Sequence, residues 1–416
     1  MGLVIICSEF ILWGAYRITL DRRLDTTIPS ANGCFGSTGY YFKIAIFGGS
    51  SAAGYNAERG FAEILKYELG KRYPNQRFCI KNYARSGQPF HRHQAEILKA
   101  VIDKYDVFLI YSGNNEAWNY WDDVGHFRKA QFKHKKQYVP PAILGSEVAF
   151  DGKPLWALFL EANSRLYAIA WKFKSKYIPP IFGKSSELDM LDEIHYGEIE
   201  KQRNFPATEV TRMIINYKKD LEDIARLARI RGKAVIVSSV PTNETWKPFF
   251  SVHRPGITVE ELSAFDQYYA SGRSSYAAGK YVDAIRYFSL AEAIDDQVAI
   301  LHYMLGVAHV RTGAIRQGQA HLMKSIDNDG FPVRAMTSLH QVLISTSRTY
   351  ENVYFVDSLR TFHDLLEKGL TYDDLFSDVQ HPSMLGHAVI ANGFLCRLSE
   401  LELLRTIARY SQKVWK

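Results

Sequence analysis

Two blocks far apart in the sequence carry the residue types of a nucleophilic site. Ser50 stands in a run of glycines and serines that directly follows the run 43–47, which is apolar except for Lys43. Near the other end of the chain, Asp378 and His381 are three positions apart. At this spacing the carboxylate can bond one imidazole nitrogen while the other nitrogen faces a serine that the fold brings close. Ser50, His381 and Asp378 thus have the residue types of a nucleophile, its base and the partner of that base.

Two further blocks offer hydrogen-bond donors for the negatively charged oxygen that such an attack creates. Gly87 follows a predicted strand and allows a backbone N–H to approach this oxygen without a Cβ in the way. Asn115, in the run 113–116, carries an amide that can donate to the same oxygen. Each block alone is common, because a Gly–Ser run is most often a plain turn and a lone Asp–His pair is most often structural. The four blocks in this order favour a catalytic site.

In this order the blocks resemble those of the SGNH hydrolases, also called the GDSL family. The resemblance covers residues 40–250 and 350–400, and it implies a serine hydrolase built on a flavodoxin-like sheet. It also implies that the backbone N–H groups of Ser50 and Gly87 and the amide of Asn115 form an oxyanion hole.

The chain departs from the family pattern at two positions. Gly49 stands where the usual signature has Asp, and Glu116 stands where the third block usually has Asp. Neither residue belongs to the expected triad. We therefore expect altered packing beside the nucleophile and an intact mechanism.

Three residues near these blocks are candidates for substrate contact. Arg85, beside the oxyanion glycine, can read a carboxylate or phosphate, although a surface arginine is the commoner role. Trp118 can stack on a sugar or hold an acyl chain, although packing is the default for an aromatic side chain. His253 can line the pocket, but a loop residue is the commoner reading. His91 and His93 lack further ligands at suitable spacing, so we expect no metal and no cofactor.

The elements that must position these blocks form the pattern of a parallel α/β sheet. Short apolar runs alternate with helical patterns at a spacing typical of βαβ units. The blocks fall where the predicted strands end, which is where open α/β sheets place their ligand sites. We predict a flavodoxin-like three-layer sandwich with a parallel sheet of about five strands, at residues 43–47, 78–82, 107–111, 234–240 and 353–357. The predicted helices lie at residues 61–69, 95–105 and 210–230, with a terminal helix from near 387.

A helical repeat separates the last two strands. The residues that recur after 34 positions are Gly272 and Gly306, Gly279 and Gly313, and Phe288 and Leu322. This offset is the period of the tetratricopeptide helix–turn–helix, so we predict an all-α insert of that kind. Two repeats bury little core alone, so the insert must lean on the hydrolase domain or on a helix near 334–346. It either binds a protein partner or braces the site, and both alternatives stay open.

Length and composition set the domain plan. The chain has 416 residues, of which 47% are hydrophobic, so it can bury a sizeable core. We expect an N-terminal segment at 1–30, a hydrolase domain at 40–255 and 350–410, and the insert at 260–348.

The N-terminal segment leaves the location of the protein open. Residues 1–16 are mostly apolar but are interrupted by Glu9, and they fall short of the ~20 residues that span a bilayer. They also lack the basic start of a signal peptide. A membrane anchor, with a place at a membrane or cell envelope, and an amphipathic helix packed on the domain remain alternatives.

The net charge of +7 is mild for this length, so we expect no nucleic-acid partner. The one basic cluster reads as a solvated face and consists of Arg128, Lys129, Lys133, Lys135 and Lys136. The four cysteines are widely spaced, and a bridge between Cys34 and Cys79 stays open.

Three functional classes compete for these features. The first is an ester hydrolase that removes an acyl or acetyl group from a carbohydrate or lipid. The second is an O-acyltransferase with the same triad, because both share the acyl-enzyme step. The third is a scaffold that binds a partner through the repeat insert.

Overall fold

The computed structural model describes residues 41–117, except 56 and 58, together with 199–200 and 207–401. Several predictions made from the sequence lie outside these residues. They concern the N-terminal segment, Cys34, Trp118, the basic cluster at 128–136 and most of the region from 120 to 205. In the part of the chain that is described, no helix is long and apolar enough to cross a membrane.

Five parallel strands form the central sheet, in the order β2–β1–β3–β5–β7. The strands are β1 (Phe42–Gly48), β2 (Phe78–Asn82), β3 (Val107–Tyr111), β5 (Ala234–Ser238) and β7 (Val353–Val356). Counted along the chain, this is the flavodoxin-like order 2-1-3-4-5. The predicted parallel α/β architecture is therefore confirmed. The second and third strands have the predicted bounds, and the others differ from them by one or two residues.

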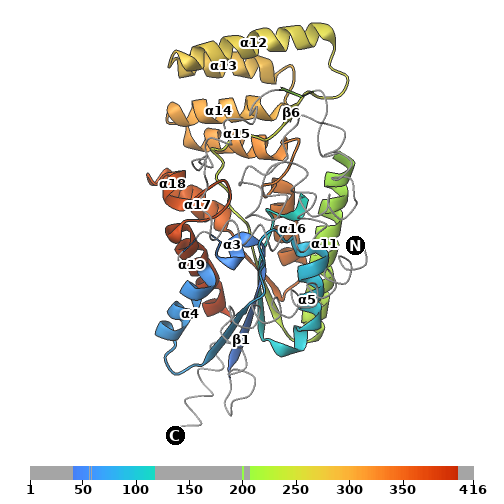
Figure 1. Ribbon diagram of the computed structural model, residues 1–416, viewed down its shortest axis with the longest axis vertical. Helices are drawn as coiled ribbons and strands as arrows, with labels where there is room; N and C mark the ends of the chain where they lie inside the picture. The colour runs from blue at the N-terminus through green and yellow to red at the C-terminus, as the bar shows by residue number, and fades with distance from the viewer. Residues whose placement is uncertain (1–40, 56, 58, 118–198, 201–206, 402–416) are drawn as a thin grey trace, which may run out of the picture. The chain divides into compact units, whose positions relative to one another are not determined.

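Helices cover both faces of the sheet (Figure 1). One face carries α4 (Phe61–Arg72) and α19 (Met384–Glu400), and the other carries α5 (Ala95–Ala100), α11 (Ala207–Ile230) and α16 (Thr337–Thr349). Neighbouring strand residues point to opposite cores: Phe47 and Phe108 pack toward α11, whereas Ile46 and Leu109 pack toward α19. A parallel sheet buried on both faces requires continuous apolar strands, which explains why β3 and β5 at its centre do not alternate with polar residues along the runs 107–111 and 234–237.

Shorter elements complete the α/β unit. They are α3 (Ser50–Ala53), a π-helical turn (Phe90–Gln94), a 3-10 turn (Ile102–Lys104), α17 (Ser358–Glu367) and α18 (Tyr372–Leu375). A separate two-stranded parallel sheet pairs β4 (Ile199–Glu200) with β6 (Ser251–Val252). The helix predicted at 95–105 is thus shorter than expected, because its last turn tightens into the 3-10 form. Cys79 is disulfide-bonded, whereas Cys396 is free and exposed.

The insert between β5 and β7 consists of two helix pairs followed by α16. The pairs are α12 (Val259–Ala277) with α13 (Tyr281–Glu292), and α14 (Ala299–Arg311) with α15 (Ile315–Asp327). A Cβ on Gly272 would lie 2.5 Å from the ring of Phe288, and a Cβ on Gly306 would lie 2.6 Å from Leu322. The repeated small residues therefore let the two helices of each pair approach closely, at equivalent places in both pairs. Assignment to the tetratricopeptide class stays a prediction.

The end of the insert is tied to the α/β unit by a buried acid. Asp329 accepts hydrogen bonds from the backbone N–H groups of Phe249 and Phe250, both at 2.9 Å. Arg334 lies 3.5 Å from the same carboxylate and donates to the carbonyl of Trp246 at 2.9 Å. Burial raises the pKa of Asp329, and the arginine and backbone donors oppose that rise. These bonds hold the insert against the segment that follows β5.

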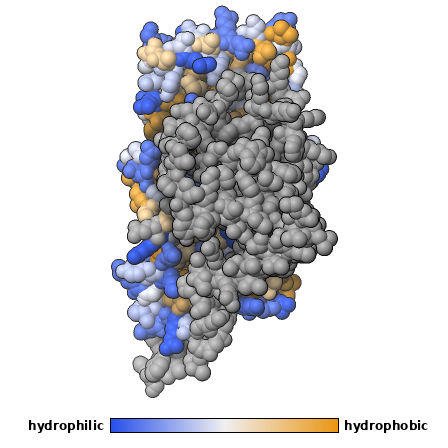
Figure 2. Space-filling model, in the orientation of Figure 1, coloured by the Kyte–Doolittle hydropathy of each residue, from blue (hydrophilic) through white to orange (hydrophobic). Residues whose placement is uncertain are grey.

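Hydrophilic and hydrophobic side chains are interspersed on the visible surface of the described elements (Figure 2). The large hydrophobic side chains that are exposed in the described part of the chain, whichever face they lie on, are spread over several helices: Tyr67, Ile215, Ile230, Val259, Val282, Leu290, Val310, Met384 and Leu385. Single exposed apolar side chains of this kind are normal and do not by themselves define a surface for a protein partner.

Candidate active site

The turn after β1 presents Ser50 at the carboxyl edge of the sheet. Gly48 has φ +155°, and a Cβ at this position would overlap the carbonyl oxygen of Tyr111 on β3. Only glycine allows β1 to approach its neighbour this closely while the chain turns. Ser50 then begins α3 and is 7% exposed.

Ser50 and His381 are joined by a hydrogen bond although they are 331 positions apart. The Oγ of Ser50 lies 2.8 Å from Nε2 of His381, and Nδ1 of the same ring lies 2.6 Å from Oδ2 of Asp378. The sequence predicted that the fold would bring these three side chains together, and the structure does so. With Nδ1–H donating to the carboxylate, Nε2 carries a lone pair that can accept the serine proton.

Asp378 is held by more than the histidine ring. Its Oδ1 accepts the backbone N–H groups of Gln380 at 2.9 Å and of His381 at 2.8 Å. Burial alone would raise the pKa of Asp378, but the hydrogen bond from His381 and the two backbone donors bring it below its ordinary value. The carboxylate is therefore ionised at neutral pH and can stabilise a protonated imidazole.

The loop that carries Asp378 and His381 is pinned to the rest of the site by two further contacts. The hydroxyl of Ser51 donates to the carbonyl of Gln380 at 3.0 Å, and the N–H of Asn243 donates to the carbonyl of Val379 at 3.0 Å. Ser51, next to Ser50, thus holds Gln380, next to His381. Sequence reasoning did not assign these roles, because they depend on which backbone groups the loop presents.

Two aromatic neighbours of His381 were also missed from the sequence. The ring of Tyr55 lies 4.7 Å from the His381 ring, centroid to centroid, so the two rings are in contact. His387 accepts a hydrogen bond from the N–H of Phe61 and is fully buried. Burial, with a smaller contribution from His381, lowers the pKa of His387 to about 4. His387 is therefore neutral and adds no second positive charge beside the base.

Asn115 lies against the residue that precedes the nucleophile. Its amide nitrogen donates to the carbonyl of Gln88 at 3.3 Å. A Cβ on Gly49 would overlap this amide nitrogen, so the amide takes the space that a side chain would need there. Gly49, which stands where the SGNH signature has Asp, thus leaves room for the Asn115 amide. One amide hydrogen orients the group on Gln88, and the amide has a second hydrogen available for donation.

Gly87 lies in a turn that is anchored beside the nucleophile. The N–H of Arg85 donates to the carbonyl of Gly48 at 3.1 Å, and the N–H of Gln88 closes the turn on Arg85. Gly87 has φ +70°, a conformation that favours glycine. Both Gly87 and Arg85 are exposed, so this turn borders solvent. Their roles toward a substrate stay predictions.

Glu116 ends the run 113–116, here called the asparagine block, and ties it to Ser112 and Phe90. Its carboxylate is buried and accepts the Ser112 hydroxyl at 2.7 Å and the Phe90 N–H at 3.1 Å. Burial raises the pKa of Glu116 to about 7, although these hydrogen bonds oppose the rise. A neighbouring link runs from the asparagine block to the insert, because Oδ1 of Asn114 accepts the N–H of Ala335 at 2.9 Å. The block is therefore held from both sides.

His253 lies away from these contacts. Its Nδ1 is 2.8 Å from Asp295, and its ring packs edge-on against Phe265 of α12, with centroids 4.8 Å apart. These two contacts are with the insert rather than with Ser50 or His381, and substrate contact by His253 stays a prediction. A cavity of about 280 Å³ also lies away from Ser50. Its lining comes mainly from α14, α15, α17 and α18.

No family model matches the chain, and no curated protein matches it in sequence. Several solved structures resemble its fold. An α/β hydrolase from the metagenome of Lake Arreo is 13% identical over 85% of this chain and 93% of that one, with a TM-score of 0.34. An acetyl xylan esterase from Geobacillus stearothermophilus is 14% identical over 86% and 94%, with a TM-score of 0.34. A lipase/acylhydrolase from Enterococcus faecalis is 10% identical over 86% and 94%, with a TM-score of 0.33. At these scores the likeness carries no argument about activity.

Proposed function

We propose that the protein is a serine esterase of the SGNH kind, with Ser50 as its nucleophile. The observation that carries the proposal is the unbroken run of hydrogen bonds from Ser50 through His381 to Asp378, at 2.8 and 2.6 Å. A serine hydroxyl is a weak nucleophile unless a base removes its proton during attack. The ionised Asp378 supports that transfer, because it stabilises the imidazolium that forms.

The reaction proceeds in two halves. Ser50 Oγ forms a bond to the acyl carbon as its proton moves to Nε2 of His381. The imidazolium then gives this proton to the alcohol oxygen, which leaves, and an acyl-Ser50 ester remains. Water repeats the sequence, because His381 takes a proton from it as it attacks the acyl carbon and returns the proton to Ser50.

Three donors are proposed for the oxyanion. The N–H of Ser50 lies in the first turn of α3, where backbone N–H groups have no acceptor within the helix. The amide of Asn115 rests against Gly49, next to the reacting oxygen. The N–H of Gly87 sits in the turn anchored on Gly48. Losing one such donor typically lowers turnover by ~10²–10³-fold.

The proposed substrate class is an acyl ester of a carbohydrate or lipid. Met384 and Leu385 follow the base closely in sequence, and their side chains are 43% and 44% exposed. They support contact with an apolar part of the substrate at the start of α19. A series of 4-nitrophenyl esters with acetyl, butyryl and decanoyl groups tests this choice, because apolar contact favours the longer chains.

Hydrolysis of these esters by purified protein, compared with Ser50→Ala, tests the activity itself. Ser274→Ala is a matched control, because Ser274 is an exposed serine on α12. We expect the first variant to lose all measurable turnover and the control to keep it. Equal turnover in parent and Ser50→Ala would exclude Ser50 as the nucleophile. Addition of glycerol distinguishes the esterase from the alternative O-acyltransferase. If acylated glycerol forms faster than free acid, the protein is a transferase.

A further inference from the structure

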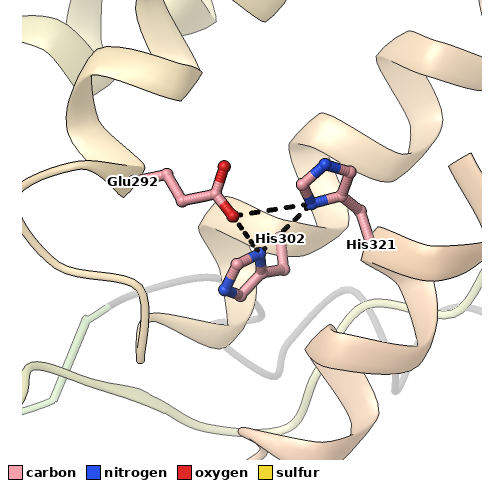
Figure 3. Close-up of side chains that lie close together, drawn as sticks. All are labelled: Glu292, His302 and His321. Atoms are coloured by element: carbon pink, nitrogen blue, oxygen red, sulfur yellow. Dashed lines mark hydrogen bonds and ion pairs between the residues drawn. The ribbon is translucent and has the colours of Figure 1, made fainter. Parts of the chain in front are cut away.

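Three side chains of metal-ligand type converge in the helical insert. Glu292 ends α13, His302 lies on α14 and His321 lies on α15, and all three point toward one another (Figure 3). The two Nδ1 atoms are 3.4 Å apart, and Oε1 of Glu292 lies 3.7 Å from His302 and 3.9 Å from His321. Each thus offers one donor atom to a common centre.

A backbone acceptor orients His302 for this task. Its Nε2 lies 2.6 Å from the carbonyl of Asp296, and a carbonyl can only accept, so Nε2 carries the hydrogen. The Nδ1 lone pair therefore faces His321 and Glu292. An imidazole whose far nitrogen donates to a carbonyl is the usual arrangement around a bound metal. His302 is fully buried, so solvent does not hydrate this lone pair.

The charges around the cluster also fit a cation. With the hydrogen of His302 on Nε2, its Nδ1 and the Glu292 carboxylate both present lone pairs to the same centre. The ammonium of Lys324 lies 3.3 Å from Oε1 of Glu292, and its side chain is 53% exposed. It supplies positive charge at the rim and can turn away into solvent.

We propose that Glu292, His302 and His321 bind a divalent transition-metal ion, with Zn²⁺ as the best match. Two imidazoles and a carboxylate are a ligand set that Zn²⁺ takes. Bonds of ~2.0–2.1 Å in a tetrahedron place ligand atoms about 3.4 Å apart, whereas an octahedron places adjacent ones about 3.0 Å apart. The observed separations match the tetrahedral value for the two nitrogens and need a shift of a few tenths of an ångström for the carboxylate.

The site would clamp the two helix pairs together. Glu292 belongs to the first pair, and the two histidines belong to the second. The side chains of His321 and Glu292 are 19% and 23% exposed, which leaves an entry path and room for water as the fourth ligand. An ion bound only by the folded chain stabilises it by mass action, so the melting temperature should rise by a few degrees at saturating metal.

Calorimetric titration of the chelator-treated full-length protein with Zn²⁺ tests the proposal. We expect one ion per chain, and Co²⁺ in its place should give the intense visible bands of a tetrahedral site. Glu292→Gln and His321→Ala change partly exposed side chains, so both variants should fold, which circular dichroism checks. Each should weaken binding by about 100-fold or more, since loss of an orienting partner alone costs 10–100-fold.

Two control variants sharpen the test. His309 stacks on His321 with ring centroids 5.4 Å apart but is not among the three ligands, so His309→Gln should retain binding. Lys324→Met removes the competing ammonium and should strengthen it. Absence of binding by the folded protein would overturn the proposal. Affinity unchanged in both Glu292→Gln and His321→Ala would also do so, because the ion would then lie elsewhere. Metal binding should be unchanged in Ser50→Ala, since this site does not depend on the esterase proposal.

Discussion

Replacement of Asp378 by Asn perturbs the chemistry of the base while keeping the shape of the loop. The amide oxygen of Asn can accept the two backbone N–H groups that Oδ1 now accepts at 2.9 and 2.8 Å. The amide nitrogen then occupies the place of Oδ2, which lies 2.6 Å from Nδ1 of His381. Two N–H groups cannot bond each other, so the ring must move its hydrogen to Nε2. In that tautomer His381 cannot accept the proton of Ser50.

The expected loss follows from this tautomer change. A histidine held in the wrong tautomer lowers kcat by about 10⁴-fold in enzymes with this type of triad. That factor corresponds to about 5.5 kcal/mol of activation free energy, at about 1.36 kcal/mol per decade. KM should change little, because Asp378 is not proposed to touch the substrate. The loss of a charged hydrogen-bond partner should lower the free energy of unfolding by about 1.5–3 kcal/mol.

Turnover of 4-nitrophenyl acetate by parent, Asp378→Asn and Asp373→Asn measures the effect. Asp373 is an exposed carboxylate five positions upstream, so its variant should keep the parent kcat. Guanidinium titration of each protein establishes that it is folded. A folded Asp378→Asn variant with kcat within tenfold of the parent would refute the assignment of His381 as a base oriented by Asp378.

Three further outcomes follow from the structure. The pKa of Glu116 near 7 exceeds the ordinary 4.5, so the folded chain binds the proton more tightly and the free energy of unfolding should fall between about pH 4.5 and 7. That fall, up to about 3 kcal/mol, should be absent in Glu116→Gln when guanidinium titrations at pH 5 and 8 are compared. Gly49→Ala should displace the amide of Asn115 and lower kcat by ~10²–10³-fold in the ester assay. Gly70→Ala, whose Cβ meets nothing within 4 Å, should leave kcat unchanged. Gly272→Ala should lower the free energy of unfolding by about 1–3 kcal/mol in the same titrations, because its Cβ would crowd the ring of Phe288.

Much of the sheet could be predicted from the sequence because its central strands are buried on both faces. The run 107–111 is wholly apolar, the run 78–82 begins with three apolar residues, and both are bounded by turn residues, so their bounds were predicted correctly. The 34-residue offset likewise recurs as equivalent packing of Gly272 on Phe288 and of Gly306 on Leu322. In both cases the structural feature depends on residues close together in the sequence, so a local pattern predicts it.

Features that depend on three-dimensional juxtaposition were not predictable. His302 and His321 are 19 positions apart on different helices, and no ligand motif has that spacing with Glu292. Tyr55 and His381 are in ring contact although they are far apart in the sequence. The raised pKa of Glu116 comes from burial, which the sequence alone does not specify.

The activated state of Ser50 is the central claim, and labelling with a fluorophosphonate probe tests it most directly. The purified protein, Ser50→Ala and His381→Ala are treated with the probe, and the modified peptide is mapped by mass spectrometry. We predict an adduct on Ser50 in the parent and none in either variant, because the hydroxyl reacts only when His381 accepts its proton. A folded parent protein without an adduct, or with one that persists in Ser50→Ala, would contradict it.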